Sequence, residues 1–453
     1  MSQTGLILVT LASIGILLFL VLKLKIQAFI SLLITSMFVG IATGMPLNEI
    51  ISSIQNGMGG TLGFVATVVG LGAIFGQILE ASGGAESLAS ALIKKFGKEK
   101  ASWALVLAGF LVAIPVFFDV GFIILVPIVY ALSKDTKKSV LHYGIPLLAG
   151  LAVTHSFIPP TPGPVAVAEI VGADLGWVIL FGAIVGVPTA IIAGPIFGKY
   201  IGEKIHLDPP EYMIKDADEM KKDIKELPSF GLITSIIGVP LVLILLNTLT
   251  DVLTKKGIID EGLFVEILGF LGHPFVALTI ATLLAVYLLG TKRGFTKDEL
   301  LELSTKALGP AGLIILVTGA GGVFKQMLID SGVGNMLADN ISNSSLPPII
   351  LAYILAVVVR ITQGSATVSM ITAAGIMAPV MEAFNLGGPD RGLIVIAIAA
   401  GATILSHVND SGFWLVGRYF GMTEEQTLKS WTMMETIISV VGFAIALILS
   451  FIF

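Results

Sequence analysis

The chain has 453 residues, of which 55% are hydrophobic and 13% are charged, and its mean hydropathy is +0.97. Because a soluble domain has about one quarter charged residues, this composition excludes an ordinary soluble protein and indicates a chain embedded in a lipid bilayer. The net charge of −5 without a basic patch argues against nucleic-acid binding, and the absence of cysteine excludes disulfides, thiolate metal sites and cysteine nucleophiles.

Apolar windows long enough to cross the hydrocarbon layer recur along the whole chain, beginning with residues 4–22, 26–43 and 62–79. Because Lys23 and Lys25 follow the first window and no basic residue precedes it, we expect a retained span with its N terminus outside. The sequence predicts an all-α polytopic membrane protein with about 12 transmembrane helices.

The apolar run of residues 101–132 is too long for one crossing. As a single helix it would measure about 48 Å, against about 30 Å for the hydrocarbon core. Pro115 and Asp119 lie near its middle, and basic segments flank both of its ends. We therefore expect a hairpin or an interrupted span, with Asp119 at the break.

A proline-rich segment follows at residues 154–170, THSFIPPTPGPVAVAEI, inside otherwise apolar sequence. Its prolines lack the backbone N–H that a regular helix needs. Unwound backbone at membrane depth is tolerated where it lines a cavity, which favours a binding loop over a connecting loop. The expected contact residues are His155, Thr161, Pro162 and Gly163, with Glu169 just beyond.

Residues 204–227 form the only long polar stretch and mix lysines with a similar number of acids. We interpret this stretch as a solvated cytoplasmic linker rather than a ligand site. It would separate an N-terminal transmembrane half, residues 1–203, from a C-terminal half, residues 228–453.

The two halves contain matched blocks: residues 44–60 resemble 294–310, and residues 70–89 resemble 319–338. The loop with Glu49 has no basic residue, whereas its equivalent carries Lys292, Arg293, Lys297 and Lys306. The positive-inside rule then puts these loops on opposite sides of the membrane, which predicts an inverted repeat. Inverted repeats are typical of secondary transporters, whose substrate sites lie where broken helices of both halves meet.

The second half contains two polar clusters within apolar sequence, RITQGSATVSM from residue 360 and SHVNDSGFW from residue 406. Their hydroxyls, amides and cation suit a polyol carboxylate. The candidate substrate-binding residues are Arg360, Gln363, Gly364, Ser365, Thr367, His407, Asn409 and Ser411.

Ionisable groups at membrane depth are functional candidates, and Asp119, Asp410 and Glu169 are the candidates for proton coupling. Each of these residues also has a purely structural interpretation. In that alternative, Arg360 only pairs with Asp410 or extends to an interface, and the candidate histidines His155 and His407 are packing residues.

Enzyme motifs are incomplete or absent. GPIFGKY, at residues 194–200, is one residue short of a phosphate-binding loop, and neither HExxH nor GxSxG occurs. We therefore expect no enzyme, no cofactor and no metal site, with energy drawn from an ion gradient or supplied by a partner. The residues leave two other protein classes open, a membrane-embedded hydrolase with paired aspartates and a passive channel. They also leave sodium open as the coupling ion.

The sequence resembles the gluconate permease family of the ion transporter superfamily. The resemblance extends over essentially the whole chain and is carried by IPVFFDVGFIILVPI, VTHSFIPPTPGPVAVAEI, QGSATVSMIT and SHVNDSGFW. It implies a bacterial inner-membrane symporter for gluconate or a related sugar acid with protons, or for D-serine or another small hydroxy acid in one branch.

The resemblance also implies two inverted halves, each with a re-entrant hairpin and a broken helix, in a homodimer that works by an elevator-type movement. Carried onto this chain, the substrate loops are Thr161 to Gly163, Gln363 to Thr367 and Asn409 to Ser411. Asp119 or Asp410 would carry the proton.

Overall fold

The computed structural model describes residues 3–210, 227–333, 347–384 and 386–453, and these residues form helices without any strand. Within these ranges, seven helices are long and apolar enough to cross a bilayer, and five further apolar helices are shorter. The predicted all-α membrane fold is confirmed, whereas helix length alone does not confirm the predicted number of crossings.

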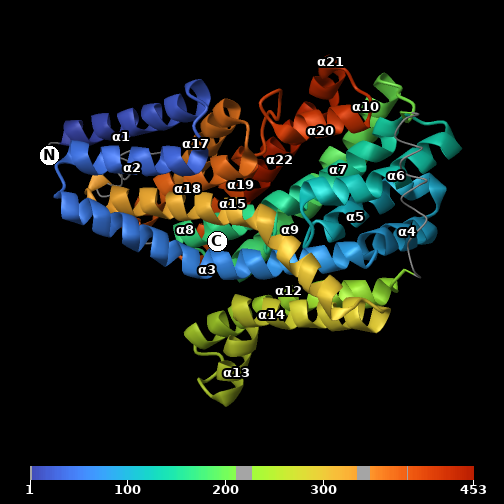
Figure 1. The fold of residues 1–453 in the computed structure, drawn as a ribbon, viewed down its shortest axis with the longest axis horizontal. Coiled ribbons are helices and arrows are strands. Elements are labelled where there is room, and N and C mark those ends of the chain that lie inside the picture. Colours follow the sequence, from blue (N-terminus) through green and yellow to red (C-terminus); the bar gives the residue numbers. More distant parts are fainter. Residues whose placement is uncertain (1–2, 211–226, 334–346, 385) are drawn as a thin grey trace.

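The first half is a bundle that begins at one end of the elongated molecule in Figure 1. Its helices are α1 (Gln3–Leu18), η1 (Phe19–Lys23), α2 (Ala28–Thr43), α3 (Leu47–Ala81), α4 (Gly84–Phe96), η2 (Lys98–Lys100), α5 (Ala101–Val112), α6 (Phe118–Thr136), α7 (Val140–Phe157), α8 (Pro162–Val171), α9 (Leu175–Ile191), η3 (Ile192–Ile196) and α10 (Phe197–Lys204). Lys204 begins the predicted linker, most of which lies outside the described residues.

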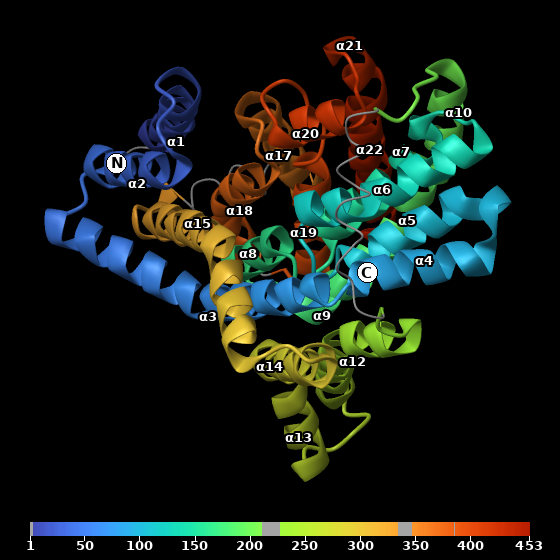
Figure 2. The ribbon, with the colours of Figure 1, turned by 45° about the vertical axis from the view of Figure 1, so that its right-hand side comes forward.

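The second half starts with a layer of three helices that project beneath α3 in Figure 2 and then returns into the bundle. Its helices are α12 (Phe230–Lys255), α13 (Leu263–Gly272), α14 (Pro274–Ala285), η5 (Val286–Gly290), η6 (Thr291–Arg293), α15 (Lys297–Asp330), α17 (Pro348–Gln363), α18 (Ala366–Ala383), α19 (Gly388–Gly401), α20 (Ser411–Tyr419), α21 (Glu424–Thr427), η7 (Leu428–Thr432) and α22 (Met433–Leu449).

Helices α3 and α15 carry the matched sequence blocks and run antiparallel along each other (Figures 1 and 2). The Ser53 hydroxyl donates to Asp330 over 2.6 Å near one end of the pair, and Gly70 faces Leu308 further along. Residue numbers therefore rise along α3 while they fall along α15. Because the two helices are equivalent in the repeat, this is the arrangement that an inverted repeat requires.

The crossing of α3 and α15 depends on small residues, and Gly57 tests this dependence. A Cβ atom at Gly57 would lie 2.6 Å from the carbonyl oxygen of Gly322 and 2.7 Å from the Cα atom of Val323. Gly57→Ala should therefore force the helices apart and destabilise the protein by about 1–3 kcal/mol. Thermal unfolding in detergent would measure this loss as a lower Tm.

Gly60 in the same helix is the matched control, because a Cβ atom there meets nothing within 4 Å. Gly60→Ala should keep or raise stability, since alanine is favoured over glycine in a helix by about 1 kcal/mol. Equal Tm values for the two variants would contradict the role of Gly57 in close packing.

Helices α5 and α6 form a hairpin. Lys98, which precedes α5, pairs with Asp135 near the end of α6 at 2.5 Å, so both helices reach the same side, and the chain reverses over residues 113–117. This confirms the hairpin predicted for the apolar run. Asp119 lies in the first turn of α6, just past the break rather than within it.

Helices α17 and α18 form the second hairpin, which turns at Gly364 and Ser365. At its open end, Pro348 and Leu386 line the same cavity, which shows that the chain returns to where it started. Both hairpins therefore present a tip inside the bundle.

Two further helices are interrupted. Residues 158–161 separate α7 from α8, and residues 402–410 separate α19 from α20. The first interruption is shorter than the proline content of residues 154–170 suggested, because His155 still belongs to α7. Pro162 occupies the first helical position of α8, where a missing N–H leaves no hydrogen bond unmade.

Candidate functional site

The tips of the two hairpins lie against the two helix interruptions. In the first half, the rings of Phe117 and His155 are 6.4 Å apart. In the second half, Gly364 is packed so closely on Asn409 that a Cβ atom would lie 2.6 Å from the Asn409 Cγ. These contacts bring polar side chains of distant segments together in two regions of the bundle, one at the tip of each hairpin.

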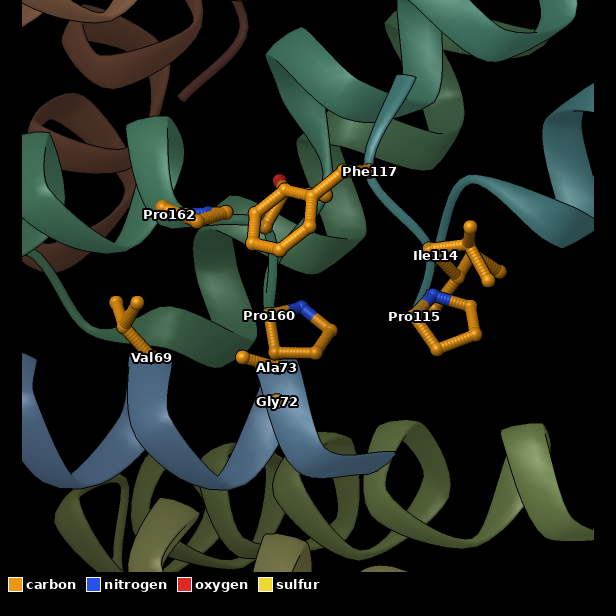
Figure 3. A pocket seen from close by; sticks show the side chains of 10 residues that line it. Val69, Gly72, Ala73, Ile114, Pro115, Phe117, Pro160 and Pro162 are labelled. Atoms are coloured by element: carbon orange, nitrogen blue, oxygen red, sulfur yellow. The ribbon is translucent and has the colours of Figure 1, made fainter. Parts of the chain in front are cut away.

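The place in the first half is a small cavity at the tip of α5 and α6 (Figure 3). Helix α3 forms its floor with Gly72 and Ala73, and Figure 3 shows the ring of Phe117 pointing toward Pro160 and Pro162. Its free volume is about 10 Å³, which is room for one water molecule. In this conformation the cavity is too small for a sugar acid.

The region at the second hairpin tip is held together by an ion pair between Arg360 and Asp410. The Arg360 Nη2 donates to the Asp410 Oδ2 over 2.6 Å, and the two side chains are only 2% and 15% exposed. The same oxygen accepts from Ser406 at 2.5 Å, and the other oxygen accepts from the backbone N–H of Gly412 at 3.2 Å. Asp410 thus caps the start of α20 while it holds Arg360 in place.

Of the alternatives for Arg360, pairing with Asp410 is the one observed, and extension to an interface is excluded by its burial. The pair uses only part of the guanidinium group. The Nε and Nη1 atoms of Arg360 are buried and have no hydrogen-bond partner within the part of the chain that the structure describes. A buried cation with free donors is costly, and it is ready for an anionic ligand.

Within the described ranges, Arg360 is not the only residue with buried and unpaired polar side-chain atoms. Among the described residues, buried side-chain atoms without a partner occur in α7, α17, α18 and α22, and they belong to Thr154, His155, Arg360, Gln363, Thr372 and Glu435. Buried polar groups are normally hydrogen-bonded, so a set of unpaired donors and acceptors indicates space for a polar ligand or water.

The first-half candidate residues are arranged as follows. His155 ends α7 with a buried Nδ1 that lacks a partner. The Thr161 hydroxyl donates to the Ile158 carbonyl over 2.6 Å, and it therefore stabilises the interruption itself. Pro162 and Gly163 start α8, where Gly163 packs on Met370 of α18.

Glu169 lies apart from this cluster, toward α15, where Lys325 is close enough to interact with it electrostatically. Asp119 is exposed and close enough to Asp410 for electrostatic interaction. The structure therefore brings Asp119 and Asp410 together and leaves Glu169 elsewhere.

The second-half candidates cluster around the end of α17. His407 and Asn409 both contact the Ile361 carbonyl oxygen, at 3.3 Å and 3.2 Å. Ser365 caps α18 by accepting from the Val368 N–H. The remaining candidates are Gln363, whose amide has no partner, Thr367, which is half-buried, and Ser411, which is exposed.

Sequence reasoning missed several polar residues of this cluster. Trp431 donates to the Ser406 hydroxyl over 2.6 Å, and its ring lies 5.5 Å from that of Phe118 at the first hairpin tip. Glu435 is 4% exposed and one of its oxygens is unpaired. The sequence pattern that could have identified Glu435 is an acidic residue within the apolar segment 424–449.

Comparisons with known proteins agree with this architecture. The family described as GntP family permease matches residues 5–452. The gluconate permease of Pseudomonas aeruginosa is 44% identical, covering 95% of this chain and 94% of that protein. The low-affinity gluconate transporter of Escherichia coli K12 is 42% identical, covering 99% of each chain.

Among solved structures, the YdaH transporter of Alcanivorax borkumensis is similar with a TM-score of 0.60 over 90% of each chain, at 15% identity. This similarity shows a shared fold. Together with the helices long enough to span a membrane, the matches make the chain a multi-pass transporter of the bacterial inner membrane and not an enzyme. The chain therefore belongs to the GntP permease family.

Proposed function

We propose that the chain imports gluconate, or a closely related sugar acid, together with protons. The relatives named as gluconate permease and gluconate transporter support the substrate, since they align over nearly the full length. The observation that carries the proposal is Arg360, a buried cation at the end of α17 with two unpaired nitrogen atoms.

The chemistry around Arg360 fits a polyol carboxylate. The two free guanidinium atoms supply donors for a carboxylate, which Arg binds in a planar, charge-assisted geometry. Unpaired hydroxyl, amide and imidazole atoms of Thr154, Gln363 and His155 supply partners for hydroxyl groups. Because the cavity at the first hairpin tip is small, we propose that a hairpin moves to admit the substrate.

Proton coupling is the second part of the proposal. An anion that binds beside Arg360 and Asp410, which are 2% and 15% exposed, adds negative charge at low dielectric. Protonation of an acid near Arg360 offsets this charge. We further propose that the protein is a homodimer, which light scattering of the detergent-purified protein tests.

The test is uptake of labelled gluconate by proteoliposomes that contain the purified protein. With the outside more acidic than the inside, we expect accumulation above equilibrium that vanishes when an ionophore collapses the proton gradient. Asp119→Asn and Asp410→Asn should each lose this accumulation. Uptake that never exceeds equilibrium, or full accumulation by both variants, would refute the proposal. An excess of unlabelled D-serine should leave gluconate uptake unchanged.

A further inference from the structure

Glu435 is a buried acid for which the packing provides no adequate partner. It lies near the start of α22, within the apolar segment Glu424–Leu449, and is 4% exposed. Its Oε1 atom has no hydrogen-bond partner among the described residues. An ionised carboxylate in such a place is expensive unless a cation or a proton compensates it.

The charged groups close enough to interact with Glu435 are Arg360 and Asp410. Asp410 is already engaged, because its oxygens accept from Arg360, Ser406 and Gly412. Asp119 is exposed, and water can solvate its charge. Glu435 is therefore the acid of this group whose ionised form is supported least.

We infer that Glu435 holds the coupling proton while the substrate carboxylate occupies the free side of Arg360, an inference that rests on the proposed symport. Without substrate, Arg360, Asp410 and ionised Glu435 together carry one negative charge. Binding of a monoanion together with one proton on Glu435 leaves that sum unchanged. The loaded and empty sites then carry the same net charge, so substrate binding adds no further charge penalty when the site crosses the membrane.

The proton comes from outside water, forms the neutral carboxylic acid of Glu435, and leaves to the inside when the substrate is released. Exposure to solvent decreases from Asp119 through Asp410 to Glu435, so Glu435 is the most deeply buried of the three acids.

The experiment compares two transport modes of Glu435→Gln, which imitates the protonated acid. With a gradient of one pH unit, the wild-type protein should accumulate gluconate about tenfold by one-to-one symport, whereas E435Q should reach equilibrium only. In vesicles loaded with unlabelled gluconate and without a gradient, E435Q should exchange labelled gluconate within about twofold of the wild-type rate, because exchange needs no release of the proton.

Glu425→Gln is the matched control: Glu425 lies at the start of the same segment, is exposed, and pairs with Lys429 at 2.5 Å. E425Q should accumulate like the wild-type protein, and Glu435→Asp should recover part of the accumulation. Normal accumulation by E435Q would overturn the assignment. Loss of both accumulation and exchange by a monodisperse E435Q protein would also overturn it, because Glu435 would then be needed for substrate binding. Failure of the wild-type protein to accumulate gluconate would instead refute the symport itself, and the assignment with it.

Discussion

Replacing Arg360 by alanine is expected to abolish gluconate uptake and to destabilise the protein strongly. The substitution removes the buried cation and leaves the Asp410 carboxylate, which is 15% exposed, without its ion-pair partner. Removing one partner of a buried pair costs about 3–5 kcal/mol. Uptake by proteoliposomes and the Tm in detergent would measure the two effects separately.

A second pair of variants separates binding from stability. Arg360→Met combined with Asp410→Asn removes both charges, so it should recover much of the lost Tm and still not transport. Arg360→Lys keeps the charge but loses the planar arrangement of donors, and it should raise the KM for gluconate at least about tenfold. Transport by the uncharged double variant would contradict the assignment of Arg360 to the substrate carboxylate.

Arg391 is the matched control for Arg360. Its guanidinium donates to the carbonyl oxygens of Leu386 at 3.0 Å and Val171 at 2.9 Å, so it joins α19 to the end of α8. Arg391→Lys should lower the Tm without a change in the KM for gluconate, because no part of this arginine belongs to the polar cluster.

The second large effect is expected for Gly364→Ala at the tip of the second hairpin. Gly364 has φ +81°, which alanine adopts only at a cost of about 1–2 kcal/mol. A Cβ atom there would also lie 2.6 Å from the Asn409 Cγ and closer still to the Asn409 carbonyl oxygen. The tip must therefore move away from the interruption between α19 and α20, and we expect uptake to fall at least about tenfold.

Gly44 provides the control for backbone strain alone. It has φ +80° after α2, and a Cβ atom there meets nothing within 4 Å. Gly44→Ala should lower the Tm by a similar conformational cost and leave the uptake rate near that of the wild-type protein. If Gly364→Ala transports as well as Gly44→Ala, the contact of the hairpin tip with Asn409 is not needed for transport.

Local sequence patterns predicted the irregular segments well, for a clear reason. Pro115 and Pro160 restrict the backbone and lack an N–H, whereas Gly364 permits a left-handed conformation that other residues avoid, so the breaks between paired helices could be read without knowledge of the fold. The boundaries were less certain, because a proline at the first position of a helix is compatible with that helix. Pro162 therefore begins α8, although the sequence suggested a longer loop.

The composition of the candidate site was predicted only in part. The polar clusters that contain Arg360 and Asp410 were visible because charges interrupt apolar sequence. Glu435 was missed, because a single acid in an apolar segment has no local sign that distinguishes a functional group from an interfacial one. Its significance comes from burial beside Arg360, which is 75 residues away in the chain.

By itself, the sequence determined the membrane environment, the helical class, the repeat and the places where helices break, because hydropathy, glycine and proline act locally. The tertiary structure alone decided that Arg360 meets Asp410, that Asp119 approaches it from the first half, and that Glu169 lies elsewhere. Such pairings join segments far apart in the chain, and they depend on how the antiparallel halves pack rather than on any pattern within one segment.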